Sequence, residues 1–448
     1  MPRSRVIVIG AGIAGLTAAS TLRRRGCEVT VLERAERAGG RITTVHLEGQ
    51  PIDVGAEYVT NAHTHTIALL RRFGLAEHLQ PVPLDIALLD GGPPQRLSLP
   101  KFFAGRHLGP SAQVGLARAY LTVLRHWPEL SFADMARAHR LDTGTTASLF
   151  PSWGGNAVQG LIHPMMRAFL FTDPHHTSRA TMLAYLKLLL TLRSVRTLTG
   201  GLQRLPQHLA ATVEVRLGHT AIDVTQDRQA HESTPGSLYE VHVTSPKGAY
   251  KLDADAVVCA TTAPAAAQIL TPLPASARNT LTTIRYASAA VLNCALQQRI
   301  SSPARWVINM ARTDQAVAIM RIIPGGAERT GDILTLWSPG GAIGAELCQL
   351  PDDQVLRRMT EQARTASPDF ALGEDIRSFR VDRWNEALPE FPVGHLRRLQ
   401  QLTAQLPHGL ALAGDYLAGQ NLEAAITSGI RAADRATAHL QQRHGPLP

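Results

Sequence analysis

The residues from Arg5 to Leu16 read RVIVIGAGIAGL, an apolar run that ends in three spaced glycines. The apolar run predicts a buried strand over 5–9, and the residues after the glycines predict a helix over 13–25. A second apolar run predicts another strand over 28–33. Together these elements occupy about thirty residues, the size of one mononucleotide-binding unit. The pattern therefore predicts an α/β domain whose parallel sheet binds a dinucleotide.

Each glycine of the G-x-G-x-x-G turn has a separate physical purpose. Gly10 makes the tight turn, Gly12 lets backbone N–H groups approach a pyrophosphate, and Gly15 lets the helix lie close to the strand. The first helical residues, Ile13 and Ala14, present the positive end of the helix dipole to the phosphates. We therefore expect the whole turn to bind the pyrophosphate.

Glu33 stands at the end of the second predicted strand, 18 residues beyond Gly15. A carboxylate there accepts ribose hydroxyls and repels a 2′-phosphate. The residues that follow include more groups expected near the phosphates, Arg34, Gly40 and Arg41. A nicotinamide-dependent enzyme has no need of this second segment, so the sequence favours a more extended dinucleotide.

Two later segments repeat the combination of a glycine turn and polar groups. The first comprises Gly55, Ala56 and Glu57, and the second comprises Gly414 and Asp415 ahead of a predicted helix. The N-terminus of that helix can also point at the ligand. A ligand with a second, electron-poor end would use both segments.

The rest of the chain alternates between helical and β patterns. A helical pattern extends over about 110–198, and its segment 182–195 is apolar nearly all round, which predicts burial against other helices. Short β runs at 213–217, 238–244 and 256–260 predict a meander. Further predicted elements are strands at 289–296, 316–322, 333–337 and 410–413, and helices at 352–365 and 423–441.

The charge balance limits the classes of partner. The 448 residues carry 45 basic and 36 acidic side chains, a net charge of +9. Positions 101–200 hold eleven Lys and Arg against four Asp and Glu, which suggests an anionic substrate, acidic lipid headgroups or a nucleic acid as a partner. No aromatic residues interleave along a basic stripe, so we do not expect nucleic-acid binding. Kinase, zinc-protease and α/β-hydrolase motifs are absent, and no metal site is predicted.

Cysteine usage and hydropathy bear on the compartment. Four widely spaced cysteines without a CxxC motif argue against a disulfide scaffold and favour a reducing cytoplasm. The first apolar run contains spaced glycines and lacks a small-residue cleavage site, which argues against a signal peptide. No apolar segment reaches the about 20 residues of a transmembrane helix. Peripheral contact with a membrane stays open.

The chain resembles the FAD-dependent superfamily of monoamine oxidases, protoporphyrinogen oxidases and carotenoid desaturases. The segments that carry the resemblance are 6–15, 33–41, Gly55, 200–202, 257–264 and 414–429. The run RWNEALPEFPVGH at 383–395 is most similar to the protoporphyrinogen oxidase branch, although Phe391 stands where that branch usually has tyrosine.

The resemblance implies a Rossmann-type FAD-binding domain of the glutathione reductase kind, with a βαβ unit and a β-meander, interleaved with an α+β substrate domain. The FAD-binding domain would be discontinuous, at 1–85, 200–265 and 380–448. The substrate domain would have a helical part, 86–199, and a sheet part, 266–379.

The resemblance also implies roles for single residues at the adenosine end of FAD. The glycine turn and Arg41 would bind the pyrophosphate. Glu33 would bind the adenosine ribose, and the backbone of Ala221 would meet the adenine.

At the flavin end, the resemblance places Asp415 near the ribityl and phosphate groups. The backbone at Ala425 and Ile426 would face flavin N1 and O2, where a helix N-terminus stabilises the negative charge of the reduced flavin. No cysteine falls at the late position where some amine oxidases attach the flavin, so we expect non-covalent FAD.

Amine-oxidising relatives surround the amine nitrogen with two aromatic residues on the flavin face. By motif spacing, those positions fall at about Phe391 and Asn421, so one aromatic is kept and one is absent. This makes a simple amine oxidase less favoured. Tyr58, Trp384 and Tyr416 lie in flavin-proximal motifs and are candidates to line the cavity, although each is more often a packing residue.

Four histidines are candidate bases, although loop histidines are usually solvated or structural. They are His163, His175, His176 and His395.

The sequence thus predicts an FAD-dependent oxidase or dehydrogenase that takes hydride from a substrate C–H bond to flavin N5, with O2 or another acceptor. The substrate would be a porphyrinogen-like or amine-containing specialised metabolite. The basic helical segment suggests that it is anionic, with Arg167 and Arg179 as candidate contacts. The alternatives are a redox-neutral isomerase or mutase on the same fold and a flavin-binding protein that has lost catalysis.

Overall fold

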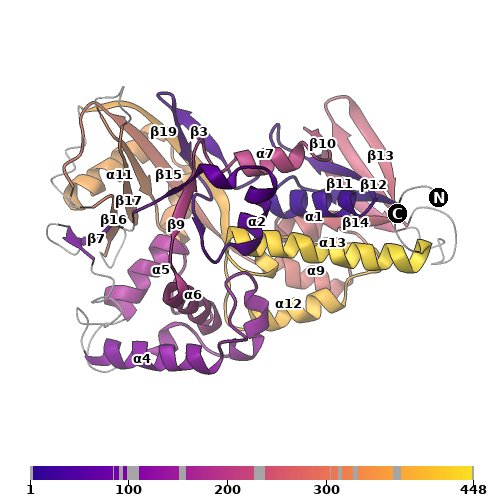
Figure 1. The fold of residues 1–448 in the computed structure, drawn as a ribbon, viewed down its shortest axis with the longest axis horizontal. Coiled ribbons are helices and arrows are strands. Elements are labelled where there is room, and N and C mark those ends of the chain that lie inside the picture. The colour runs from indigo at the N-terminus through magenta and orange to yellow at the C-terminus, as the bar shows by residue number, and fades with distance from the viewer. Residues whose placement is uncertain are drawn as a thin grey trace.

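The computed structural model describes residues 4–83, 85–89, 94–97, 110–150, 158–226, 238–302, 304–310, 315–325, 331–366 and 375–445. Figure 1 shows a half built on a parallel sheet, at the right, and a half built on a larger mixed sheet, at the upper left. A block of helices lies below the mixed sheet, with α4 (Pro110–Arg125) along the lower margin.

A five-stranded parallel sheet forms the core of the first half, and its strands come from widely separated parts of the chain. Their spatial order is β10 (Glu214–Leu217), β2 (Glu28–Glu33), β1 (Arg5–Ile9), β14 (Ala256–Cys259) and β20 (Leu410–Leu412). The inner strands of a parallel sheet are covered on both faces, which explains why β1 and β14 are short apolar runs, whereas β10 at one edge is partly exposed. The predicted strands at 5–9, 28–33 and 410–413 are confirmed within one residue.

Two helices lie side by side along this sheet, α1 (Ile13–Arg24) and α13 (Leu422–His444) (Figure 1). Their backbones approach closely, because a Cβ at Gly429 would collide with Ala14 O. The helices predicted at 13–25 and 423–441 are therefore confirmed, with small differences at their ends.

The predicted meander is correct in kind and wrong in its strands. The antiparallel sheet consists of β11 (Thr220–Gln226), β12 (Tyr239–Ser245) and β13 (Gly248–Ala254). The runs at 213–217 and 256–260 instead join the parallel sheet as β10 and β14. β14 is short, apolar and fully buried, as a central parallel strand is, whereas β10 is a partly exposed edge strand and β11 and β13 are half exposed and give a weaker signal.

A seven-stranded sheet dominates the second half. Its order is β19 (Ile376–Pro389), β15 (Tyr286–Leu296), β18 (Ile333–Trp337), β17 (Ile319–Ile323), β16 (Trp306–Asn309), β7 (Ile86–Leu89) and β8 (Gln95–Arg96). Its neighbours are antiparallel except β16 and β7. α10 (Gly341–Gln349) and α11 (Asp352–Ala366) pack on it.

The strands of the seven-stranded sheet do not follow the domain boundaries expected from the sequence. β7 and β8 belong to this sheet although segment 86–199 was expected to be helical. β19 runs through the expected boundary between 379 and 380.

The helical block contains α4, α5 (His163–Phe169) and α6 (Arg179–Thr191). Full burial of the apolar segment at 182–195 was predicted, and this is wrong at the end of α6, where Leu189 and Leu190 are 37% and 48% exposed. On α4 the buried side chains include Leu116, Ala119 and Val123, so Leu121 and Leu124 on another face are exposed. The block also includes the turns η2 (Met135–Leu141), η3 (Ala147–Leu149) and η4 (Val158–Ile162).

Shorter elements connect the sheets and the helical block. The strands among them are β3 (Thr44–Leu47), β4 (Gln50–Asp53), β5 (Val59–Thr60), β6 (Leu79–Pro81) and β9 (Val195–Leu198). The helices and turns are α2 (Thr64–Arg72), α7 (Arg204–Ala210), α8 (Ala263–Ile269), α9 (Ala275–Thr282), α12 (His395–Ala404), η1 (Ala76–His78) and η5 (Asp415–Leu417). Across the described ranges, every helix is too short or too polar to cross a bilayer.

Candidate active site

The glycine turn between β1 and α1 has the geometry of a phosphate cradle. Gly10 has a φ of +102°, and a Cβ there would lie 2.9 Å from Ala260 O. A Cβ at Gly15 would collide with Gly10 O, whereas a Cβ at Gly12 would meet no atom within 4 Å. Gly10 and Gly15 are thus required by the protein itself. Gly12 borders open space at the start of α1, which has no capping side chain.

Gly39 and Gly40, which follow Glu33 in the chain, lie directly against this turn. Gly39 N–H donates to Ala11 O at 2.8 Å, and a Cβ at Gly40 would lie 3.3 Å from Gly12 Cα. Arg37 Nη2 donates to Gly40 O at 3.0 Å, while its buried Nη1 has no hydrogen-bond partner among the described residues. A cationic donor therefore lies beside the open edge of the cradle.

Glu33 lies at the same turn. Its Oε2 accepts from Ala11 N–H at 2.7 Å and its Oε1 from Ala35 N–H at 2.9 Å. His219 N–H donates to Glu33 O at 2.9 Å, which brings the start of β11, and so Ala221, next to it. The sequence-predicted ribose and adenine residues therefore converge, while Arg34 is exposed.

Arg41 and Asp415 meet across the sheet although they are 374 residues apart. The guanidinium donates to both carboxylate oxygens, at 2.6 and 2.8 Å, and Nη1 also donates to Ala387 O at 2.9 Å. Although burial lowers the pKa of Arg41, the Asp415 carboxylate raises it above its ordinary value. The Tyr286 ring, 5.8 Å from the guanidinium, completes this enclosure.

The third glycine segment follows β4 and packs on Arg41. A Cβ at Gly55 would collide with Arg41 O, and Ala56 N–H donates to the same oxygen at 3.0 Å. Glu57 is buried and forms an ion pair with Arg321 of β17. Gly55, Ala56 and Glu57 therefore join the cofactor half to the seven-stranded sheet.

Tyr58 faces an aromatic and cationic wall on that sheet. Its ring lies 5.3 Å from Trp306 and 5.5 Å from the Arg321 guanidinium. Burial, together with Asp53, raises the pKa of Tyr58 above its ordinary value, and its buried hydroxyl has no partner among the described residues. Burial lowers the pKa of Arg321 to about 10, and Asp53 opposes that shift. Of this wall, the Tyr58 hydroxyl is thus the group with an unused hydrogen bond among the described residues.

Arg321 and Trp306 were not singled out from the sequence. A lone arginine inside the apolar run Ile319–Ile323 is the signal that could have drawn attention to Arg321, because a charge in a buried strand needs a partner. Trp306 carried no comparable signal.

Two of the aromatic candidates are engaged in the protein framework. Trp384 donates from Nε1 to Val54 O at 2.6 Å, which ties β19 to the cofactor half. Phe391 is fully buried, with its ring 4.4 Å from that of His395. Burial lowers the pKa of His395 to about 4, and its ring nitrogen Nε2 lies 3.1 Å from Tyr416 O. Tyr416 is also fully buried.

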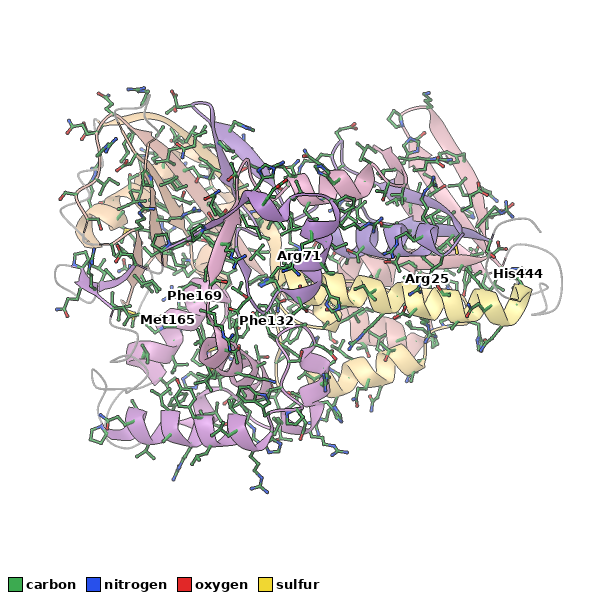
Figure 2. The ribbon with its side chains drawn as sticks, viewed as in Figure 1. Arg25, Arg71, Phe132, Met165, Phe169 and His444 are labelled. Atoms are coloured by element: carbon green, nitrogen blue, oxygen red, sulfur yellow. The ribbon has the colours of Figure 1, made fainter. Side chains whose placement is uncertain are left out.

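Asn421 caps α13. Its side-chain oxygen accepts from Ala424 N–H at 2.8 Å, and its amide nitrogen donates to Phe132 O at 2.9 Å. Figure 2 shows Phe132 beside the first turn of α13. Both polar ends of Asn421 are therefore used in positioning the helix.

The N–H groups of Ala425 and Ile426, which the resemblance places at the flavin, lie beyond the open amides at the start of α13. Ala425 N–H already donates to Asn421 O at 3.1 Å, and Ile426 is one residue deeper in the helix. Leu422 and Glu423 open the helix, and in the described part of the chain no hydrogen bond engages their N–H groups. The open amides of a helix are those of its first turn. Because α13 begins at Leu422, the candidate donors are Leu422 and Glu423, three residues before Ala425 and Ile426.

Glu423 is a buried carboxylate that the sequence patterns did not predict. It accepts from the N–H groups of His65 and Thr66 at 2.6 and 3.0 Å, and from the Thr66 hydroxyl at 2.7 Å. Although burial raises the pKa of Glu423, these hydrogen bonds lower it overall. The residue joins the N-terminus of α2 to α13. In the sequence, the one indication of this site is an acidic residue within the apolar first turns of the last helix.

The basic residues proposed as substrate contacts lie in the helical block. Arg179 donates to Leu141 O at 3.1 Å and to the Thr143 hydroxyl at 2.6 Å, so it stabilises a loop. Arg167 lies on α5, next to His163, whose Nε2 is 3.3 Å from Asp173. His175 and His176 are exposed at the adjoining turn.

The family model for flavin-containing amine oxidoreductases matches residues 13–437. The chain belongs to this family. It is an FAD-dependent oxidoreductase that acts on a small molecule and passes electrons to an acceptor, as the resemblance implied.

Proteins similar to this chain include porphyrinogen-oxidising and amine-oxidising relatives. Coproporphyrinogen III oxidase of Mycobacterium bovis is 27% identical over 459 aligned residues, which cover 96% of each chain. A protein from Exiguobacterium sp. 255-15 assigned to the protoporphyrinogen oxidases has a similar fold, with a TM-score of 0.75, 18% identity and coverage of 98% and 100%. Cyclohexylamine oxidase from Brevibacterium oxydans has a TM-score of 0.72, with 20% identity and coverage of 98% and 99%. The expected α/β fold with an FAD-binding half is thereby confirmed.

The residues present fit FAD. The open space at Gly12, the uncapped start of α1 and the Arg37 Nη1 donor, which no described residue engages, suit a pyrophosphate. The open amides at Leu422 and Glu423 suit an electron-poor ring that takes up negative charge.

Proposed function

We propose that this protein oxidises a porphyrinogen of the coproporphyrinogen type, using non-covalently bound FAD. The proposal is carried by the likeness to a coproporphyrinogen III oxidase over 96% of both chains. Asn421 supports it, because a capping amide with both ends engaged cannot complete an aromatic pair around an amine.

The residues that would hold FAD come from three parts of the chain. The turn from Gly10 to Gly15, including Ile13 and Ala14, would take the pyrophosphate, with Gly40 and Arg41 beside it. Glu33 would take the adenosine ribose. Arg41 would then exchange part of its contact with Asp415 for a phosphate oxygen, leaving the carboxylate for a ribityl hydroxyl.

At the flavin end, Gly55 and Ala56 would contact the ring, and the amides of Leu422 and Glu423 would stabilise negative charge at N1 and O2. Bound FAD supplies the hydride acceptor, N5. Oxidation of a porphyrinogen removes hydrogen from its methylene bridges and pyrrole nitrogens as the macrocycle becomes aromatic, so the protein has only to orient the substrate and exclude water.

Tyr58, Trp306 and Arg321 would form the polar end of the substrate cavity. Their aromatic faces suit a flat macrocycle, and the Tyr58 hydroxyl has a hydrogen bond to give. Arg321 already pairs with Glu57, and its guanidinium would share that contact with a substrate carboxylate.

The test is an anaerobic mixing experiment with FAD-loaded protein and coproporphyrinogen III. We expect loss of the flavin band at about 450 nm, and porphyrin fluorescence only after O2 is admitted, at a rate above that of an enzyme-free control, because a single FAD takes up only part of the hydrogen that the full conversion releases. Reduction by putrescine or cyclohexylamine, with no response to coproporphyrinogen III, would overturn the proposal in favour of amine oxidation. Substrate conversion without use of any electron acceptor would instead support the isomerase or mutase alternative. Acid precipitation should release the flavin into solution.

A further inference from the structure

A cavity of about 410 Å³ lies behind the cofactor half, between η2, α12, β20 and α13. It is separate from the FAD cradle, because its walls include none of the glycine turn, Glu33, Arg41 or the Gly55 segment. Pockets that bind small ligands are commonly about 300–1,000 Å³ in volume. The cavity is therefore large enough for a small organic molecule.

The walls of the cavity combine apolar surface with positive charge. Leu399, Leu406 and Leu417 supply apolar surface. The charged side chains are three arginines and Asp134, a net charge of +2.

The three arginines are not equally available to a ligand. Arg431 pairs with both oxygens of Asp134, and Arg435 donates to the carbonyl oxygens of Leu410, Thr403 and Leu406. Arg137 is exposed, and among the described residues its guanidinium donates only from Nη2, to Pro128 O at 3.0 Å, so its other N–H groups can meet an anion.

The cavity also meets the outer edge of the parallel sheet, at Leu412. Ala413 N–H donates to Cys259 O at 2.9 Å, and the register places Leu412 opposite Cys259. In a parallel ladder the residue opposite Cys259 directs its own N–H and C=O away from that strand. Within the described residues no hydrogen bond engages either group, although Leu412 is only 5% exposed.

A buried backbone donor and acceptor without partners cost free energy unless a ligand or water satisfies them. The N–H and C=O of Leu412 point to the same side of the strand, so one amino acid residue can satisfy both with its own N–H and C-terminal oxygen, as the opposite residue does in an antiparallel pair. In an N-acylated amino acid the amide N–H would donate to Leu412 O, and one carboxylate oxygen would accept from Leu412 N–H. The remaining features call for an apolar side chain against the leucines and an anion near Arg137.

We propose that this cavity is a second binding site, for a small N-acylated amino acid or a molecule of the same chemistry: one amide, one carboxylate and an apolar side chain. The back wall of the site is joined to the FAD half, because Ser428, which lines the cavity, accepts from Gly414 N–H at 2.8 Å. Gly414 precedes Asp415, so the ligand would lie behind the turn that carries this carboxylate.

The test is calorimetric titration of FAD-loaded protein with N-acetyl-L-leucine. We expect a Kd of about 1 mM or below. N-acetyl-L-leucinamide lacks the carboxylate and 4-methylpentanoate lacks the amide, so each should bind about tenfold more weakly. Equal binding of all three compounds, or no heat with any of them, would overturn the proposal.

Matched variants locate the site. Arg137→Ala should weaken N-acetyl-L-leucine about fivefold to tenfold and leave N-acetyl-L-leucinamide unchanged, whereas Arg140→Ala, an exposed arginine of the same turn that does not line the cavity, should change neither. Ala432→Phe would fill the cavity and should abolish binding while FAD content stays at the wild-type level. Identical affinities in the Arg137 and Arg140 variants would refute the site even if Ala432→Phe did not fold.

Discussion

Substitution of Gly12 by alanine separates cofactor binding from folding. Gly12 has φ and ψ of −71° and 172°, which alanine adopts freely, and the added Cβ would meet no protein atom within 4 Å. The flavin-free Gly12→Ala protein should therefore keep its free energy of unfolding within about 1 kcal/mol of wild type. The Cβ would instead occupy the space in which a phosphate approaches the backbone amides.

The effect on FAD follows from the hydrogen bonds that the displaced pyrophosphate could no longer accept. Moving it away from two amide N–H groups, at about 1.5 kcal/mol for each bond to a charged group, would cost about 3 kcal/mol. The Kd for FAD should then rise about 100-fold. Titration of flavin-free protein with FAD, followed by flavin fluorescence, measures this directly.

Gly15→Ala is the matched control. Its Cβ would collide with Gly10 O and lie 2.9 Å from Ala260 Cβ, so α1 would have to move away from β1. We expect a loss of about 1–3 kcal/mol in urea unfolding of the flavin-free protein, unlike Gly12→Ala. If Gly12→Ala bound FAD as tightly as wild type, the phosphate position argued from this turn would be wrong.

Three further predictions concern stability and surfaces. Burial raises the pKa of Asp53 to about 6, above its ordinary value of 3.8, so the folded protein binds this proton more tightly than the unfolded chain does. The contribution of Asp53 to the free energy of unfolding should therefore fall by up to about 3 kcal/mol as the pH rises from about 4 to 6. Urea unfolding across this range should show a flatter profile for Asp53→Asn. Glu423→Gln should cost about 2 kcal/mol in unfolding, because it removes a buried anion from the start of a helix. Leu121 and Leu124 are 66% and 62% exposed on a basic segment, so Leu121→Glu with Leu124→Glu should weaken sedimentation with phosphatidylglycerol vesicles.

Each of these predictions has its own control. The difference in the free energy of unfolding between wild type and Asp53→Asn, measured at each pH, isolates Asp53 from other titrating groups. If the two proteins gave parallel pH profiles, the raised pKa of Asp53 would be wrong. Unchanged unfolding of Glu423→Gln would show that the helix start does not depend on the charge. Ile222→Glu alters an exposed residue of β11 and should leave vesicle binding unchanged, while equal loss in both variants would point to a general charge effect.

The sequence predicted best what depends on neighbours in the chain. The glycine turn, its two strands and its helix lie within 29 residues, from Arg5 to Glu33, so apolar periodicity and glycine spacing were sufficient. The pairing of Arg41 with Asp415 joins residues 374 positions apart and was not predicted, because the resemblance to a known family only placed each of them near the phosphate groups of FAD.

Other features depend on contacts that no local pattern encodes. The Arg321 wall arises because β17 and the segment after β4 face each other, and the open amide at Leu412 arises because β20 is an edge strand. The expected flavin-facing amides at Ala425 and Ile426 were displaced because Asn421 caps the helix, which a helical pattern locates only within a few residues.

The strand order of the parallel sheet has a consequence for biosynthesis. β1 pairs with β14, so Val6 can form its sheet contact with Ala256 only after 250 further residues have been synthesised. β20 and α13 are synthesised later still. At about 5–20 residues per second, a ribosome needs roughly 12–50 s to make that neighbour available. During this interval the apolar faces of the first strand and helix emerge without their native cover. Nascent chains of this protein should therefore depend on chaperones, and they should acquire their cofactor only after translation has passed α13.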